Sequence, residues 1–511
     1  MFSAASPPAA VTAKRGSVGD STRPRAGTLG VSPTQLVIAL TVLGGVLRFA
    51  TLNVSSIELD ESATMILVHR GFSGMLSHLT SSESAPPLYY VLVWAWTKVF
   101  GAGAIGFRSF SALVGTATIP VMYAAGREIS PRTGVWAALL TTVSPSMYFF
   151  SQEARAYALL VLFSAAAFVY WQRALKQPST RHLAMWAVMS SLALLTHYFA
   201  AFMFIPETLV LVIRLDRRRV LAPAGAVVLV GLALVPLAAS QRADGKTNWI
   251  EELSLPRRVA ESMKTFTVGI YGPLVLFALV VAVALAAGAV VLVWRRGDER
   301  ERNGARNAAI VAGVSLGLPL VLAVTHLVDV YDGRNVLASW IPLAVLVAAG
   351  LGSERAARSG ALLGGALCAI CVAMIVAANA VGDYQRDDWR GVARTLGTPT
   401  TARLLVAEAH ASRPLSIYMR SLSGVSATLP RVTEVDFVAL RHLRTVGPPQ
   451  AAVVPTSPPP GFRLVGVTRR ETFAISYFVA ARPTAPTLAS LTQLGANRAI
   501  GQMTIEAFLQ R

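Results

Sequence analysis

Charged residues are scarce in this chain of 511 residues: Asp, Glu, Lys and Arg together make up 14%, whereas 54% of the residues are hydrophobic. A soluble globular domain carries about 25% charged residues, so this composition, with its mean hydropathy of +0.53, excludes an ordinary soluble protein. A helix needs about 20 mostly apolar residues to cross a bilayer. Runs of that order recur across residues 35–380, which predicts a polytopic membrane protein.

Cysteine is nearly absent. The two cysteines, Cys368 and Cys371, lie inside the apolar run 360–378, and no second Cys or His pair accompanies them. A zinc site of the paired type is therefore excluded, and we interpret both thiols as packing or lipid-facing side chains. The sequence shows no Gly-rich phosphate loop after residue 380 and no internal repeat. The lack of a repeat disfavours transporters built from inverted repeats.

Lysine is rare as well, with five among the 46 basic residues, although the formal net charge is +19. The arginines gather in short clusters between apolar runs, at 214–219, 295–306 and 355–358. The positive-inside rule assigns such clusters to cytoplasmic loops. The excess charge therefore indicates membrane topology, and we expect no nucleic-acid partner.

Eleven spanning helices are expected. Arg15 and its basic neighbours place the N-terminus in the cytoplasm, and an odd number of spans then places the C-terminus outside. The stretch 87–100 is too short for a span and is assigned to the outer interface. The pair 183–196 and 198–213 is also short, so one long helix or a re-entrant hairpin is the alternative there. The expected spans are 34–52, 107–126, 132–150, 155–173, 183–196, 198–213, 219–238, 271–294, 306–327, 335–352 and 358–380.

The predicted fold class is an all-α polytopic membrane bundle followed by a small extracytoplasmic α/β domain. Residues 1–32, rich in Ser, Pro, Ala, Thr and Arg, are expected to form a disordered cytoplasmic tail. The bundle occupies 33–380, with an outer loop at 52–107. Residues 381–511 form the second domain, with a Pro-rich loop at 456–460. Its strand-like runs are 403–407, 451–455, 463–467 and 472–480.

This topology gathers the polar segments of the chain on one face. Five of them point outward: 52–108, 151–157, 197–198, 240–269 and 331–334. Asp60 and Glu61 follow the first helix at the mouth of the bundle. A carboxylate there can act as general base, removing the proton of an acceptor hydroxyl as its oxygen attacks the anomeric carbon of a sugar. The alternative is that both acids cap a helix or mark an outer loop.

Three arginines are expected at outer helix ends, where topology needs no positive charge: Arg108, Arg155 and Arg334. A guanidinium offers paired donors to phosphate oxygens, so these residues are candidates for binding a leaving phosphate. The alternatives are local ion pairs, Arg155 with Glu153 and Arg334 with Asp332, and interfacial anchoring by Arg108.

Further side chains on this face are candidates for contacts with a sugar or a phosphate: Gln152, Glu153, Tyr157, His197 and Tyr198. His197 lies where two short apolar helices meet, and a hydrogen-bonded core position is equally compatible with that place. Trp249 could stack on a sugar or an isoprenoid, but the favoured interpretation is an interfacial belt tryptophan.

Short motifs follow one another in order along residues 35–395: Leu59-Asp-Glu61, Ala85-Pro-Pro-Leu-Tyr-Tyr90, Phe100-Gly101, Arg108-Ser-Phe-Ser111, Ser144-Pro145 with Tyr148, Ser151-Gln-Glu-Ala-Arg-Ala-Tyr157, Thr196-His-Tyr-Phe199, Asp332-Gly-Arg334 and Asp387-Asp-Trp-Arg-Gly391. This ordered set resembles the polyprenyl-phosphate-dependent GT-C glycosyltransferases, in particular the bacterial relatives of the protein O-mannosyltransferases (glycosyltransferase family 39). The resemblance implies that Asp60 is an essential carboxylate, that the donor is a polyprenyl or dolichyl phosphate sugar, and that transfer inverts the anomeric centre. Ala85 and Asn335 depart from the family, which often has His and Tyr there, so the choice of donor stays open.

The sequence therefore predicts an inverting glycosyltransferase in the inner membrane of a bacterium. It would move a sugar, mannose or a related hexose or pentose, from a polyprenyl-phosphate donor to an acceptor hydroxyl at the outer face. The acceptor, whether protein, glycolipid or polysaccharide, is not indicated, and the expected cofactor is none or a divalent cation at Asp60. The alternatives are a transporter or flippase of lipid-linked sugars and a non-catalytic membrane scaffold.

Overall fold

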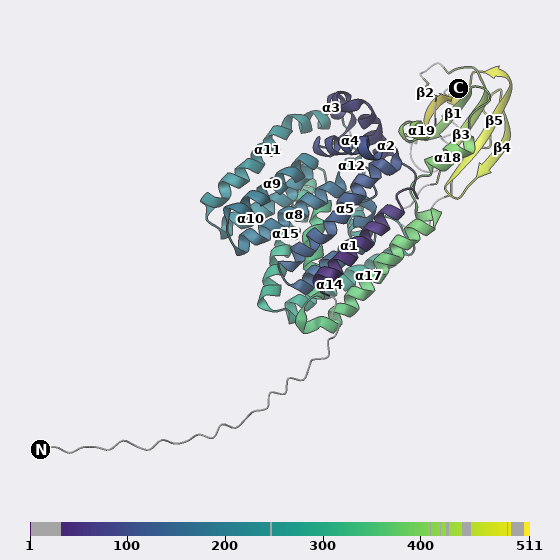
Figure 1. Cartoon of the computed structure of the whole chain (residues 1–511). Coiled ribbons are helices and arrows are strands. Elements are labelled where there is room, and N and C mark those ends of the chain that lie inside the picture. The colour runs from purple at the N-terminus through teal and green to yellow at the C-terminus, as the bar shows by residue number, and fades with distance from the viewer. Residues whose placement is uncertain are drawn as a thin grey trace.

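The computed structural model describes residue 1 and residues 32–245, 248–408, 410–419, 421–425, 429–441, 451–487, 489–491 and 505–510. Figure 1 shows a bundle of long helices with a sheet domain, formed by the C-terminal residues, at one end. The predicted fold class, a helical membrane bundle with a small α/β domain, is confirmed. The predicted tail at 1–32 lies, apart from its first and last residues, outside the described residues.

All eleven expected spans correspond to helical structure. Within the described part of the chain, seven helices are long and apolar enough to cross a bilayer: α1 (Pro33–Ala50), α5 (Ala104–Arg127), α8 (Tyr157–Lys176), α11 (Arg217–Ala243), α14 (Val275–Arg296), α15 (Glu299–Val324) and α17 (Ala357–Ala380). The other expected spans are built from shorter pieces: α6 (Pro131–Val143), α7 (Pro145–Phe150), α9 (Thr180–Thr196), η1 (Tyr198–Ala200), α10 (Ala201–Arg214), η2 (Leu337–Ser339) and α16 (Trp340–Leu351), which η3 (Glu354–Ala356) follows. The chain is thus a multi-pass membrane protein, and the total of eleven spans stays a prediction.

Two breaks in these helices place polar residues at one end of the bundle. Residues that precede a proline avoid the α-helical conformation, and Ser144 accordingly has an extended backbone (ψ 124°) ahead of Pro145. The Ser144 hydroxyl then caps α7 by accepting a hydrogen bond from the Met147 amide. His197, which has an extended backbone (φ −156°) but no proline after it, separates α9 from η1, and its side chain accepts a hydrogen bond from the Phe199 amide. The His197 break coincides with the segment 197–198 that the sequence assigned to the outer face, whereas the Ser144 break interrupts the expected span 132–150.

Short helices cover this end of the bundle, on the side of the sheet domain (Figure 1). They are α2 (Leu59–His69), α3 (Gly71–Ser82), α4 (Leu88–Phe100), α12 (Trp249–Glu252) and α13 (Leu255–Thr267). Helix α4 forms from the short apolar stretch at 87–100 and has 13 residues, fewer than the roughly 20 that a span needs. It packs against α2, α3, α5 and α9. Its place in the outer interface stays a prediction.

The described residues of the C-terminal domain form a six-stranded sheet in the order β2-β6-β1-β3-β5-β4. Only the pair β1–β3 is parallel among the described strands. Alternate residues of β1 enter the two apolar layers that flank the sheet, and α18 and α19 belong to one of these layers. The elements are η4 (Gly382–Tyr384), α18 (Trp389–Leu396), β1 (Arg403–Glu408), α19 (Ser412–Tyr418), β2 (Leu422–Gly424), β3 (Val432–Leu440), β4 (Arg463–Arg469), β5 (Phe473–Thr484) and β6 (Ile505–Gln510).

The strand predictions are right at 403–407, 463–467 and 472–480 and wrong at 451–455, where the described chain is irregular. That segment packs onto the sheet instead of pairing with it: Val454 is buried, and the carbonyl of Pro455 accepts a hydrogen bond from Ser476 (2.7 Å). The prediction failed because residues 451–455 are apolar and in part buried, as in a strand, but do not pair with another described strand. Strands β2, β3 and β6 were not expected.

Candidate functional site

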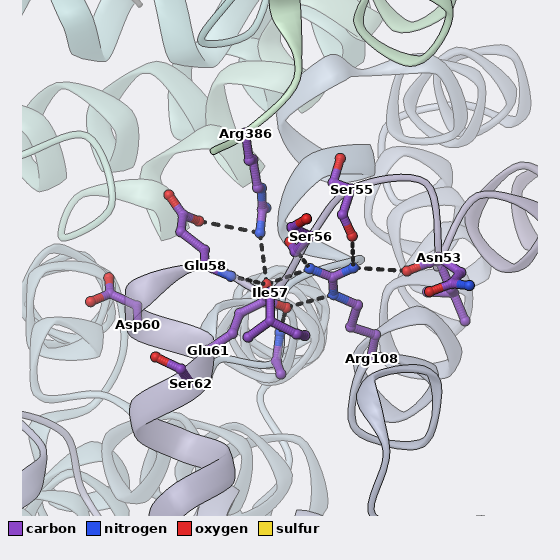
Figure 2. A network of polar contacts seen from close by, with 12 residues as sticks. Asn53, Ser55, Ser56, Ile57, Glu58, Asp60, Glu61, Ser62, Arg108 and Arg386 are labelled. Atoms are coloured by element: carbon purple, nitrogen blue, oxygen red, sulfur yellow. Dashed lines mark hydrogen bonds and ion pairs between the residues drawn. The ribbon is translucent and has the colours of Figure 1, made fainter. Parts of the chain in front are cut away.

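The first turn of α2 presents the two predicted carboxylates in different directions. The backbone amide of Glu58 donates to Oε2 of Glu61 (3.2 Å), which draws the Glu61 side chain back over the start of the helix. Figure 2 shows Asp60 pointing away from Glu61 and from the groups that surround it. The two neighbours in sequence therefore have separate environments.

Glu61 and Arg108 form a pair that is buried in the bundle, with side chains 0% and 2% exposed. The Arg108 guanidinium donates to both Glu61 oxygens, through Nε (2.7 Å) and Nη2 (2.5 Å). Its other hydrogen bonds go to the carbonyls of Leu52, Ser55 and Ser56 (2.8–2.9 Å). A guanidinium has five N–H groups, so all of them are engaged (Figure 2).

These contacts occupy both side chains, so the catalytic role of Glu61 and the phosphate contact of Arg108 stay predictions; Arg108 also lines the pocket beside this cluster. Glu61 also accepts a hydrogen bond from the Ala154 amide (2.9 Å). Burial raises the pKa of Glu61, but Arg108, Arg386 and the amide lower it further, to about 2. Glu61 is thus a fixed, ionised anchor. The pair holds the loop between α1 and α2 to α5 and to the segment before α8.

Arg386, from the start of the C-terminal domain, adds a second guanidinium to this cluster. Its Nη1 lies 3.2 Å from carboxylate oxygens of both Glu58 and Glu61, and its guanidinium lies 4.0 Å from the centroid of the Phe149 ring. The side chain is 9% exposed. Arg386 was not among the predicted site residues, although one signal was present: it directly precedes the 387–391 motif, and the predicted topology puts it on the side where no positive charge is needed.

Asp60 differs from Glu61 because it is accessible. Its side chain is 38% exposed, and Arg334 donates to Oδ2 at 2.9 Å. Among the described residues, Oδ1 accepts no hydrogen bond. Burial raises the pKa of Asp60, but the guanidinium groups of Arg155 and Arg334 outweigh it, so the pKa lies below its ordinary value. An ionised carboxylate with one open oxygen is the state that a general base requires.

Arg155 does not form the local ion pair that the sequence left open. Its Nη1 donates to Glu83 (2.6 Å) and to the hydroxyl of Thr64 (3.3 Å). Glu153 is instead 3% exposed, and its Oε2 has no hydrogen-bond partner among the described residues. Burial, opposed by Arg386 and reinforced by nearby carboxylates, raises the pKa of Glu153 to about 8. Glu83 was not predicted as part of the site.

Arg334 forms the local pair with Asp332 (3.3 Å) that the sequence left open as the alternative, together with a longer-range pair with Asp60. Its guanidinium also lies 4.9 Å from the centroid of the Trp249 ring. The indole is 38% exposed. Trp249 therefore lies beside Arg334, the partner of Asp60, and its exposed ring is compatible with stacking on a sugar.

The other predicted residues lie around this cluster. Gln152 donates to the carbonyl of Arg48 (2.8 Å) and to the hydroxyl of Thr51, which ties the end of α1 to the segment before α8. Tyr198 donates to Gln241 (2.8 Å) on α11, and its contacts do not reach the charged groups around Asp60. Both side chains act within the fold in this structure.

Tyr157 and His197 are buried side by side, with ring centroids 5.8 Å apart. The His197 Nδ1 accepts a hydrogen bond from the amide of Phe199 (3.4 Å), which supports the core-position alternative. Burial, with Arg155 and Arg334 next in effect, lowers the pKa of His197 to about 3. The imidazole is therefore neutral and does not compete with Asp60 as a charged group.

A pocket of about 710 Å³, counted with its open mouth, lies beside the charged cluster. Its wall is polar at Gln152 and Arg386 and apolar at Met374 and Ile375. Asp60 does not line it. Among the residues that the structure describes, no group of three or more His, Cys, Asp or Glu side chains is arranged to hold a metal ion. A cation at Asp60 stays a prediction.

Comparisons with known proteins agree with the architecture. Residues 84–240 match the family described as "Dolichyl-phosphate-mannose-protein mannosyltransferase". The fold is similar to that of ArnT from Cupriavidus metallidurans in the apo state, with 13% identity over 76% of this chain and 84% of that chain and a TM-score of 0.51. The same protein bound to undecaprenyl phosphate gives 13% identity, 76% and 85% coverage and a TM-score of 0.49.

A weaker likeness is found to the protein O-mannosyltransferase Pmt1-Pmt2 complex of S. cerevisiae, with 17% identity, 43% of this chain, 34% of that chain and a TM-score of 0.32. No curated protein sequence matches the chain. The family match and the fold support the resemblance that the sequence motifs carried. The chain has the fold of the GT-C superfamily of glycosyltransferases.

Proposed function

We propose that the chain is an inverting glycosyltransferase that moves a sugar from a polyprenyl-phosphate donor to an acceptor hydroxyl. The reaction takes place at the outer face of the bacterial cytoplasmic membrane, where the C-terminal domain also lies. The observation that carries the proposal is the state of Asp60: an ionised carboxylate with an open oxygen, beside two guanidinium groups, in a bundle of GT-C fold.

The proposed chemistry needs one base and no acid. Asp60 removes the proton of the acceptor hydroxyl as that oxygen attacks the anomeric carbon from the side opposite the phosphate. The bond between that carbon and the phosphate oxygen breaks with its electron pair on the phosphate, so the anomeric configuration inverts. Arg334 and Arg155, with side chains 32% and 13% exposed, are the candidates for stabilising the leaving charge. The name of the family that matches residues 84–240 supports a lipid-phosphate donor.

The test uses the full chain reconstituted in lipid, incubated with a panel of radiolabelled polyprenyl-phosphate sugars and membrane extract, with and without divalent cations. Asp60→Asn keeps the size of the side chain and removes the base, so transfer should fall by a factor of about 10²–10⁴. The matched control is Glu252→Gln, which neutralises an exposed carboxylate on α12.

Full transfer by Asp60→Asn would contradict the assignment of the base. The absence of turnover with every donor, together with movement of the labelled lipid between leaflets, would favour the flippase. A panel in which one sugar is transferred identifies the donor, and the labelled product then identifies the acceptor.

A further inference from the structure

The loop that carries Asp60 has little structure of its own. Between the end of α1 at Ala50 and the start of α2 at Leu59 the described chain forms no helix or strand. Ser56 and Ile57 in this stretch are nevertheless 4% and 0% exposed. Contacts with other parts of the protein must therefore fix the loop. Arg108 supplies those on the side of the loop that faces the bundle.

The C-terminal domain also contacts the loop, and Figure 2 shows one of these contacts, that of Arg386 with Glu58 and Glu61. Four of its residues, which we call the clamp, contact residues 53–61: Arg386, Asp388, Arg390 and Tyr418. Arg390 donates to the carbonyls of Asn53 (2.9 Å) and Ser55 (3.1 Å). Its backbone amide donates to the hydroxyl of Ser56 (3.1 Å), which in turn donates to Asp388 (2.9 Å).

The clamp also reaches the residues next to Asp60. The amide of Ile57 donates to the hydroxyl oxygen of Tyr418 (2.7 Å). Arg386 pairs with Glu58 and Glu61, which lie on either side of Asp60 along the chain. Because a residue in the first turn of a helix can move only with its neighbours, these contacts limit the directions that Asp60 can take.

The clamp is itself fixed in the core of the C-terminal domain. Asp388 caps α18 by accepting a hydrogen bond from the Gly391 amide (2.9 Å). Trp389, the next residue, is 5% exposed and packs in the apolar layer beneath the sheet. Tyr418 is the last residue of α19, which packs against α2. The clamp residues thus connect the loop to the core of the sheet domain, so the position of the domain determines the position of the loop.

We propose that the C-terminal domain is a positioning element for sugar transfer, and that Arg386, Asp388, Arg390 and Tyr418 hold the 53–61 loop so that Asp60 faces Arg334 and the acceptor. The inference rests on the proposed role of Asp60 as base. In this arrangement Arg386 is a positioning residue. The competing assignment is direct contact of Arg386 with substrate, since it also lines the pocket beside the cluster.

Steady-state kinetics of the full chain in lipid separate the two assignments. A base displaced by about 1 Å can cost a factor of 10² in rate. We therefore expect Arg386→Gln and Asp388→Asn to lower kcat by about 10–100-fold while the KM for the donor changes less than about threefold. Arg386→Lys keeps the charge and should recover part of the rate. The control, Arg463→Gln, changes an exposed arginine on β4 of the same domain and should behave as wild type.

The pH dependence of kcat gives a second test, because the loss of a purely structural role of Arg386 would leave the pH profile unchanged. Arg386 is one of three cations, with Arg155 and Arg334, that lower the pKa of Asp60. Glu58 and Glu153 face the same cluster and oppose them. In Arg386→Gln the acid limb of the kcat profile should therefore move to higher pH. Arg386→Lys should leave it nearer the wild-type position.

A wild-type kcat and pH profile in Arg386→Gln would overturn the inference. A raised donor KM with unchanged kcat would overturn it too, because Arg386 would then be a substrate ligand. If Arg386→Gln does not fold, Tyr418→Phe, which removes a single hydrogen-bond acceptor, must reproduce the loss of kcat. Wild-type transfer by Asp60→Asn would refute the base and this inference together, whereas an inactive Asp60→Asn beside fully active clamp variants refutes the clamp alone.

Discussion

Arg108→Lys tests whether Arg108 is part of the fold or part of the donor site. Lysine keeps the positive charge but has three N–H donors on a flexible stem in place of five in a rigid plane. Arg108 uses all five, two for Glu61 and three for backbone carbonyls. At least two of these five acceptors must therefore lose the hydrogen bond that residue 108 donates in the wild type.

The size of the effect follows from that count. Hydrogen bonds to charged groups contribute about 1.5–3 kcal/mol each, so two lost bonds cost about 3 kcal/mol at the lower end of that range. A loss of this size changes the ratio of folded to unfolded protein by about a hundredfold, since 1.4 kcal/mol is a factor of ten. The thermal midpoint should fall by on the order of 5 °C.

The assay is the temperature at which half of the purified protein remains monodisperse in detergent, because large membrane proteins unfold irreversibly. Arg127→Lys is the matched control: it makes the same change on the same helix, α5, at an exposed position. An Arg108→Lys protein with an unchanged midpoint and a raised KM for the donor would refute the reasoning. Arg108 would then contact the phosphate, as the sequence suggested.

Other changes have defined outcomes. Asp60 has a lowered pKa, so the kcat of the wild type should stay constant down to about pH 4, near the ordinary carboxyl value. In Arg334→Gln one of the cations that oppose the effect of burial on the pKa of Asp60 is gone, so the acid limb of the kcat–pH profile should move to higher pH. Gly350→Ala would place a methyl group 1.8 Å from a backbone oxygen of α14 and should lower the thermal midpoint, whereas Gly313→Ala, with no atom within 4 Å, should not. If the Trp249 ring stacks on the sugar, Trp249→Ala should raise the KM for the donor and Trp249→Phe should keep it near the wild-type value. A wild-type KM in both variants would favour the interfacial belt role of Trp249.

The membrane helices could be located from the sequence because the signal for them is local. A span is an apolar run whose length is fixed by the bilayer, and each of the eleven expected runs is helical in the structure. The sheet is different. Strand β3 contains Asp436, which interrupts its apolar pattern and is tolerated because Arg403, 33 residues earlier, pairs with it at 3.2 Å. The hydrophobic pattern of residues 432–440 alone therefore gives no indication that Arg403 pairs with Asp436.

The candidate site, like the fold, could be predicted from the sequence only in part. Alternation of spans places Asp60, Arg155 and Arg334 on one side of the membrane, and the structure does bring them together. The partners that decide their states are distant in sequence. Arg386 lies 325 residues from Glu61, and nothing in the local composition around either residue indicates the other. The sequence therefore indicated some charged groups of the site, Asp60, Arg155 and Arg334 among them, but neither Arg386 and Glu83 nor the pairing of the groups.

This distinction explains why an adjacent Asp-Glu pair can serve two purposes. Successive residues on an α-helix are rotated by about 100°, so Asp60 and Glu61 cannot share one environment. Glu61 points into the bundle, where two guanidinium groups and a backbone amide saturate it. Asp60 points outward, where Arg334 occupies one of its oxygens and leaves the other open. The buried carboxylate fixes the turn of helix, and that fixed turn is what lets the exposed carboxylate meet an incoming hydroxyl in one orientation.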